Sequence, residues 1–181
     1  MQTTRYSAGA MILHWTIAIL VIVNWRLAAG AEHLEGAAKG ALMGPHKAIG
    51  MSILLLTLAR IAWRLTHKTP PLSAKLAGWE VMLAKAVHGI FYLLLLGLPL
   101  GGWLASSMFG AGIDFFGLFT IPALPVGANK DLGGTLFDAH KVGGTVMLYL
   151  IVLHVLGALK HTVVDKDGNI FRMLPFGTPK A

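Results

Sequence analysis

Residues 135–161 read TLFDAHKVGGTVMLYLIVLHVLGALKH. The run 142–159 within this stretch contains no Asp, Glu, Lys or Arg, and a run of this length can cross a bilayer as a helix. His140, His154 and His161 nevertheless interrupt the apolar pattern, and an imidazole is costly in hydrocarbon unless it has a partner. The stretch therefore predicts a membrane-spanning helix whose histidines hold something.

The rest of the chain has the same apolar character. Of the 181 residues, 55% are hydrophobic and 13% are charged, about half the charged fraction of a typical soluble domain. Further charge-free runs occur at 7–25, 48–59 and 86–113. Because a spanning helix needs about 20 apolar residues, we expect an all-α membrane protein, with one domain over residues 1–181. The four transmembrane helices are expected at about 8–29, 45–65, 80–105 and 136–162.

Two segments have alternative interpretations. The first apolar run resembles a secretory signal, but it is longer than the usual signal core and carries His14 and Asn24, which favours a spanning helix. The longest connection, 106–134, contains the apolar sequence FFGLF at 115–119. It is expected either to lie in the membrane interface as a short amphipathic cap or to pack on the mouth of the bundle.

The basic residues indicate the orientation. With four spanning helices, both termini lie on one side of the membrane. Ten of the 15 Lys and Arg residues fall on that side, and five fall on the opposite, outer side. The positive-inside rule then predicts a multi-pass membrane protein with both termini in the cytoplasm. The positive charge is explained by this topology, so we expect no nucleic-acid partner. The five outer residues are Arg26, Lys39, Lys47, Lys130 and Lys141.

Helical geometry places the histidines at different depths. The 14 residues between His140 and His154 advance about 21 Å and return to nearly the same face, so one metal ion cannot contact both. His46 lies at the expected depth of His140. His14 and His88 both lie near the depth of His154, so the sequence leaves the choice between them open.

Two imidazoles at each of two depths favour haem over zinc. A zinc site needs about four clustered ligands, whereas a b-type haem can take one histidine on each face of a flat macrocycle. The chain has no cysteine, which excludes disulfides, iron–sulfur clusters and covalently attached haem. We therefore predict two non-covalent b-type haems. Glycines near the histidines are expected to make room for the macrocycles, namely Gly50, Gly89, Gly143, Gly144 and Gly157.

Four basic residues have two interpretations each. Arg60 and Arg64 follow His46 at a spacing that brings them to the depth of the inner haem, where they can pair with its propionates. They can equally be interface anchors that snorkel to the surface. Lys47 and Lys141 directly follow the proposed outer ligands and either serve the outer propionates or mark the interface.

The sequence resembles the bacterial cytochrome b561 family over nearly its whole length. The matching features are His14-Trp15, His46 with Gly50, and Arg60 and Arg64 leading to Thr69-Pro70-Pro71. They continue with His88 through Leu98-Pro99, and with His140, His154 and His161. The resemblance implies a four-helix bundle in which His14 and His154 hold the inner haem and His46 and His140 hold the outer haem.

The resemblance also implies a function. A relative described as a superoxide oxidase passes electrons from superoxide, outside, to ubiquinone in the membrane, which would make this protein an oxidoreductase with lipid and quinone as partners. Lys130, Lys141 and Lys47 would attract the anionic reductant, and His161 or His88 would supply protons on the quinone side. Two alternatives stay open: a diheme subunit that docks a periplasmic or membrane redox protein, and a haem-free bundle with a proton-relay ladder.

Overall fold

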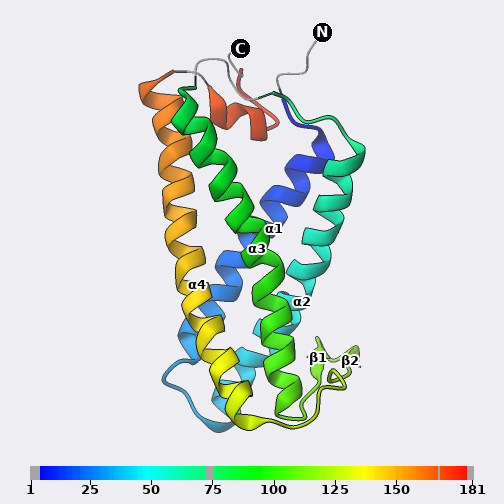
Figure 1. The fold of residues 1–181 in the computed structure, drawn as a ribbon. Coiled ribbons are helices and arrows are strands. Elements are labelled where there is room, and N and C mark those ends of the chain that lie inside the picture. Colours follow the sequence, from blue (N-terminus) through cyan, green and yellow to red (C-terminus); the bar gives the residue numbers. More distant parts are fainter. Residues whose placement is uncertain (1–4, 72–75, 167, 179–181) are drawn as a thin grey trace.

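The fold is known from a computed structural model that describes residues 5–71, 76–166 and 168–178. Four long helices run side by side (Figure 1): α1 (Ala8–Ala31), α2 (Gly36–Thr66), α3 (Gly78–Met108) and α4 (Lys130–Leu159). Each is long and apolar enough to cross a membrane. The chain is therefore a four-helix membrane bundle, as its charge-free runs predict.

Two helices begin earlier than those runs suggest. α2 begins at Gly36 rather than near residue 45 and contains Pro45, and α4 begins at Lys130 rather than near 136. Asn129 caps α4, because its side-chain Oδ1 accepts a hydrogen bond from the backbone N–H of Leu132 at 3.1 Å. A charge-free run marks only the part of a helix that lies in hydrocarbon, so helices that continue into water are underestimated.

Both described ends of the chain lie at the same end of the bundle. The guanidinium of Arg5 donates to the backbone carbonyl of Pro175 at 3.2 Å, and the backbone N–H of Tyr6 donates to the carbonyl of Arg172 at 3.0 Å. After α4, the chain continues as a π-helical turn (η1, Lys160–Val164) and a 3₁₀ turn (η2, Asn169–Met173). We call this the terminal end.

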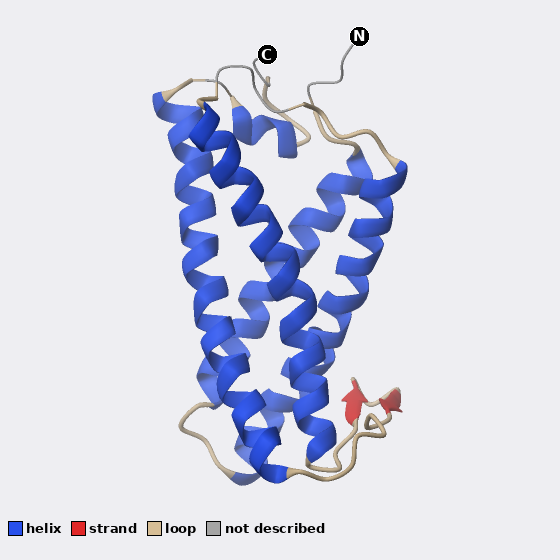
Figure 2. Ribbon diagram, viewed as in Figure 1, coloured by secondary structure: helices blue, strands red, loops and turns tan. Residues whose placement is uncertain are grey.

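The opposite end carries an antiparallel β-hairpin of β1 (Ile113–Phe115) and β2 (Phe119–Ile121). It lies beside the helices rather than beyond their tips (Figure 2). In place of the short amphipathic cap expected in 106–134, this segment contains a hairpin. Gly117 permits the tight turn between its two strands. We call this the hairpin end.

Close helix contacts are concentrated at a few glycines. A Cβ at Gly9 would lie 2.4 Å from the indole of Trp63, so α1 approaches α2 closely there. A Cβ at Gly143 would lie 2.6 Å from Leu98, which marks a similar contact between α4 and α3. At Gly89, Gly144 and Gly157 no such neighbour lies within 4 Å. Helices that touch in some places therefore leave room elsewhere.

Candidate haem centres

The imidazoles of His46 and His140 face each other near the hairpin end. Their ring centroids are 6.0 Å apart, and the rings are inclined at 82°. Nδ1 of His46 lies 3.1 Å from the backbone carbonyl oxygen of Asn24, and Nδ1 of His140 lies 2.9 Å from that of Leu98. A protonated Nδ1 that donates to a carbonyl leaves Nε2 unprotonated, which is the form that a metal ion requires. α1 and α3 thus orient the two rings that α2 and α4 supply.

Gly102 lies directly against His140. A Cβ at this position would lie 3.2 Å from Cε1 and 3.3 Å from Nδ1 of the imidazole, closer than ordinary van der Waals contact. Gly102 and Leu98 are four residues apart on α3 and so share one face of the helix. The contact with His140 could not be predicted from the sequence for either residue, because the approach of α3 to α4 is a property of packing.

The second group of histidines lies nearer the terminal end. The centroids of His14 and His154 are 6.3 Å apart, and those of His88 and His154 are 5.7 Å apart. α1, α3 and α4 therefore bring three imidazoles together at one depth, as the helical spacing predicts. Both distances are similar, so the pairing of His14 with His154 stays a prediction.

The separations fit a metal held between two imidazoles. A histidine nitrogen binds a metal at about 2 Å, and the ring centroid lies about 1 Å further out, so two opposed rings are about 6 Å apart. His46 with His140 and His14 with His154 match this value. Near the first pair, Oδ1 of Asn24 is buried without a hydrogen-bond partner among the described residues. The donor set, four neutral nitrogens and no thiolate, suits b-type haem.

The glycines have two different roles. Gly89, Gly144 and Gly157 have no neighbour within 4 Å of a Cβ position, so there is open space beside each, and its use by a macrocycle stays a prediction. Gly50 faces the side-chain nitrogen of Asn24 at 3.8 Å. Gly143 is different, because Leu98 of α3 already fills the space beside it. The expectation that Gly143 makes room for haem is therefore wrong, and its role is to let α3 and α4 approach.

Arg60 and Arg64 line a hollow at the terminal end together with Tyr6 and Tyr92. Nη1 of Arg60 donates to the backbone carbonyl of Ala10 at 2.9 Å, which links α2 to α1. Pairing with haem propionates stays a prediction for both residues.

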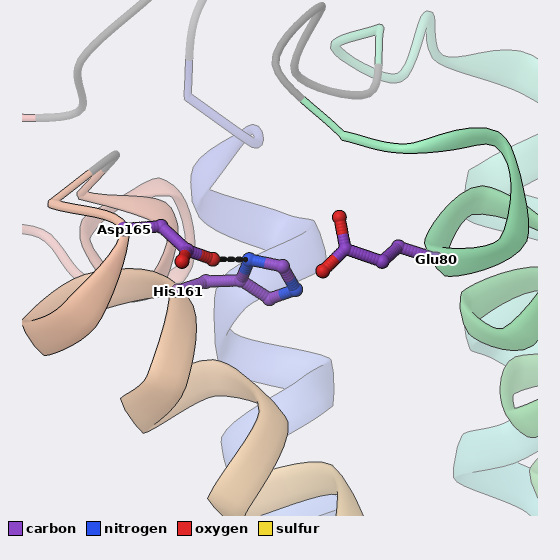
Figure 3. A group of neighbouring side chains, drawn as sticks. All are labelled: Glu80, His161 and Asp165. Atoms are coloured by element: carbon purple, nitrogen blue, oxygen red, sulfur yellow. Dashed lines mark ion pairs between the residues drawn. The ribbon is translucent and has the colours of Figure 1, made fainter.

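His161 belongs to a polar cluster on the terminal side of His154. Its Nδ1 lies 2.7 Å from Oδ2 of Asp165, and Glu80 of α3 faces the ring from the other side (Figure 3). The ammonium of Lys160 contacts Glu80 at 2.6 Å and Asp165 at 2.8 Å. The Lys160 hydrogen bond lowers the pKa of the Asp165 carboxyl below its usual value. The sequence alone did not indicate Glu80 and Asp165, because the π-helical turn and a contact across helices bring them together.

Lys160 also affects whether this cluster can bind a metal. Glu80, His161 and Asp165 offer ligand atoms within 4.8 Å of one another. The ammonium, however, already contacts both carboxylates. A divalent ion would have to displace it, so the arrangement is better suited to holding and passing protons.

The three lysines predicted to form an outer mouth do not form one tight group. Lys141 makes an ion pair with Glu32 at 3.5 Å, and Lys47 is half-buried beside His46. Lys130 is exposed at the start of α4, 11 residues and therefore about 16 Å along the helix from Lys141. The five basic residues of the hairpin end are matched by five acidic ones, so any attraction of anions there is local. The acidic residues are Glu32, Glu35, Asp114, Asp131 and Asp138.

Comparison with known proteins supports the same assignment. Residues 5–176 match the family described as prokaryotic cytochrome b561. The chain belongs to this family. Its members transfer electrons in membranes, and membership implies a b-type haem, for which the histidines above are the candidate donors. Membership of this family thus accounts for both the four-helix fold and the histidines on it.

Individual relatives cover nearly the whole of this cytochrome b561. A protein named probable superoxide oxidase CybB from Yersinia pestis is 33% identical over 175 residues, which are 94% of this chain and 96% of the relative. Cytochrome b561 homolog 2 of Escherichia coli K12 is 31% identical over 94% of this chain and 91% of its own length. Cytochrome b561 homolog 1 of the same organism is 24% identical over 94% and 97%.

Proposed function

We propose that this protein carries electrons across the bacterial inner membrane, oxidising superoxide at the hairpin end and reducing ubiquinone near the terminal end. The observation that carries the proposal is the geometry of α4, which presents His140 and His154 to partner imidazoles at 6.0 and 6.3 Å. The two levels are about 21 Å apart along the helix. This spacing extends over most of a hydrocarbon core about 30 Å thick.

The proposed ligand sets agree with the same geometry, and the family resemblance favours His14 over His88 as the partner of His154. His46 and His140 would hold one b-type haem, and His14 and His154 would hold the other. When bound between these histidine pairs, the two haems would supply one-electron redox chemistry. The protein orients the imidazoles through the Asn24 carbonyl on one ring and the Leu98 carbonyl on the other.

The overall reaction balances with two equivalents of superoxide. Each superoxide loses one electron and becomes dioxygen, and two electrons with two protons convert one ubiquinone to its quinol. The protons would come from the terminal side, where the His161–Asp165 pair and Glu80 form a continuous polar cluster. His88 is the second candidate, because its ring reaches His154. The positive-inside rule supports placing the terminal end in the cytoplasm.

Local charge near His46 and His140 supports an anionic reductant. Lys47 and Lys141 directly follow the two histidines in sequence. Attraction between exposed charges weakens as salt shortens the Debye length, which is about 10 Å at 0.1 M. We therefore expect reduction by superoxide to slow with rising ionic strength. Because the hairpin end carries as many acidic as basic residues, the effect should be modest, and Lys141→Gln should reduce it.

Stopped-flow reduction of the purified protein in liposomes tests the proposal. Superoxide should reduce the protein on the time scale of the stopped-flow measurement, and added ubiquinone should reoxidise it. A haem-containing protein that superoxide does not reduce would contradict the proposal and favour the alternative, a diheme subunit that receives electrons from a docked protein. A folded protein without reducible haem bands would favour the haem-free bundle.

The proton role of His161 is tested separately. His161→Ala should slow quinone reduction while leaving reduction by superoxide unchanged, because the substitution affects only the terminal end. His33→Ala is the matched control, since His33 is an exposed histidine at the hairpin end. Equal quinone reduction in the His161 and His33 variants would exclude His161 from this role.

A further inference from the structure

From the hairpin end, the β-hairpin folds back along the helices, so that it lies beside the middle of their length. Ile113 of β1 is 3% exposed and forms one apolar cluster with Met51 and Leu54 of α2. These two are the sixteenth and nineteenth of the 31 residues of α2, about halfway along the helix. Leu96 and Trp103 of α3 pack on the same cluster. The hairpin therefore occupies the groove between α2 and α3 at membrane depth.

The turn end of the hairpin, its tip, is apolar and open, whereas the exposed cross-strand pair Asp114 and Thr120 lies on the face opposite Ile113 and Phe115. Phe116 is 50% exposed, Leu118 is 77% exposed and Phe119 is 57% exposed. Phe119 stacks on Phe115 at 5.0 Å, so the aromatic side chains form a continuous surface. The sequence 115–129 contains no Asp, Glu, Lys or Arg. The tip of the hairpin therefore suits hydrocarbon rather than water.

The turn places an aromatic residue where the backbone disfavours it. Phe116 has φ of +55°, a left-handed conformation that is costly for a bulky side chain, and Gly117 follows with φ of +73°. Turns of this kind favour Asn or Asp before Gly. The strain is held by the backbone N–H of Leu118, which donates to the Phe115 carbonyl at 3.0 Å. A phenylalanine at a strained position indicates a use for its side chain.

Several polar groups of the hairpin and its flanks are paired within the protein, which a lipid environment favours. The backbone N–H of Gly117 donates to the carboxylate of Asp114 at 2.9 Å. The indole N–H of Trp103 donates to the Pro122 carbonyl at 3.1 Å, and the hydroxyl of Ser107 accepts from the N–H of Leu124 at 2.9 Å. The bonds from Trp103 and Ser107 fasten the C-terminal end of the hairpin to α3.

We propose that residues 113–121 are a re-entrant anchor whose tip, formed by Phe116, Leu118 and Phe119, inserts into the lipid leaflet at the hairpin end of the bundle. The tip continues the apolar surface of the helices, since Leu55 of α2 and Leu93 of α3 are also exposed. Because the hairpin packs beside the middle of α2, a water-soluble partner would have to enter the bilayer to cover the tip.

Spin labelling tests the anchor directly, because the chain has no cysteine to remove. Leu118→Cys is labelled with a nitroxide in protein reconstituted in phosphatidylcholine–phosphatidylglycerol liposomes, and its relaxation by oxygen and by a water-soluble nickel complex is measured. Leu93→Cys, exposed in the middle of α3, provides the lipid reference. Glu35→Cys, exposed just before α2, provides the water reference. Retained haem bands show that each labelled variant is folded.

The anchor predicts that the Leu118 label behaves like the Leu93 label, with more relaxation by oxygen than by nickel. Behaviour like the Glu35 label would overturn the proposal. Low relaxation by both reagents together with spin–spin broadening would also overturn it, because a second copy of the chain would then cover the tip. Phe116→Asn offers a second readout: it relieves the turn but removes the aromatic ring, so access of nickel to the Leu118 label should rise. Unchanged access in that variant would count against a role for the ring.

Discussion

Replacing Gly102 by Ala should weaken one haem centre through a single methyl group. The new Cβ would lie 3.2 Å from Cε1 and 3.3 Å from Nδ1 of His140, so the imidazole must retreat by a few tenths of an ångström. The retreat leads away from α3 and therefore lengthens the 2.9 Å bond from Nδ1 to the Leu98 carbonyl. A lost hydrogen bond of this type costs about 1 kcal/mol, roughly fivefold in affinity. Loss of a partner that orients a metal ligand typically costs 10- to 100-fold, which sets the upper limit.

Gly101→Ala is the matched control for this prediction. No neighbour lies within 4 Å of a Cβ at Gly101, and both substitutions give the helix the same gain in backbone stability, about 0.5–1 kcal/mol. Transfer of haem to excess apomyoglobin measures the loss from each centre as a separate phase. Gly102→Ala should accelerate one phase by roughly five- to 100-fold, and Gly101→Ala should accelerate neither. Equal rates in the two variants would refute the idea that α3 positions His140.

Two further predictions concern the terminal end. His14→Ala should lower the haem-to-protein ratio by one, whereas His88→Ala should leave it unchanged; the reverse result would make His88 the ligand. Because the Lys160 hydrogen bond lowers the pKa of Asp165 on folding, this carboxylate stabilises the folded state above the unfolded Asp pKa of about 3.9, and the contribution disappears as pH falls through the lower folded value. The difference in thermal stability between the wild type and Asp165→Asn should thus be largest above the unfolded Asp pKa and disappear as pH falls through the lower folded pKa. A difference that grows on acidification would contradict the sign.

The four-helix fold and the depths of the histidines could be predicted from the sequence, because both follow from local regularities. A charge-free run of about 20 residues indicates a span, and 3.6 residues per turn relate His140 to His154 without knowledge of any other helix. The ends of the helices could be predicted less accurately. Gly36 and Lys130 begin their helices in segments where polarity no longer indicates helix.

Features that depend on contacts between helices could not be predicted in the same way. The carbonyls of Asn24 and Leu98 orient histidines 22 and 42 residues away, and no spacing rule connects these positions. Glu80 reaches the His161 cluster from another helix in the same manner. Gly143 shows the converse problem. Its place beside a histidine suggested room for a cofactor, but the neighbouring Leu98 side chain decides its role.

The haem-to-protein ratio of the purified chain tests the central claim most directly. Pyridine haemochrome absorbance gives the b-type haem content, and amino-acid analysis of the same sample gives the protein content. Two opposed imidazole pairs, His46 with His140 and His14 with His154, predict two haems per chain. A folded, fully loaded protein that holds only one haem, or none, would contradict the account.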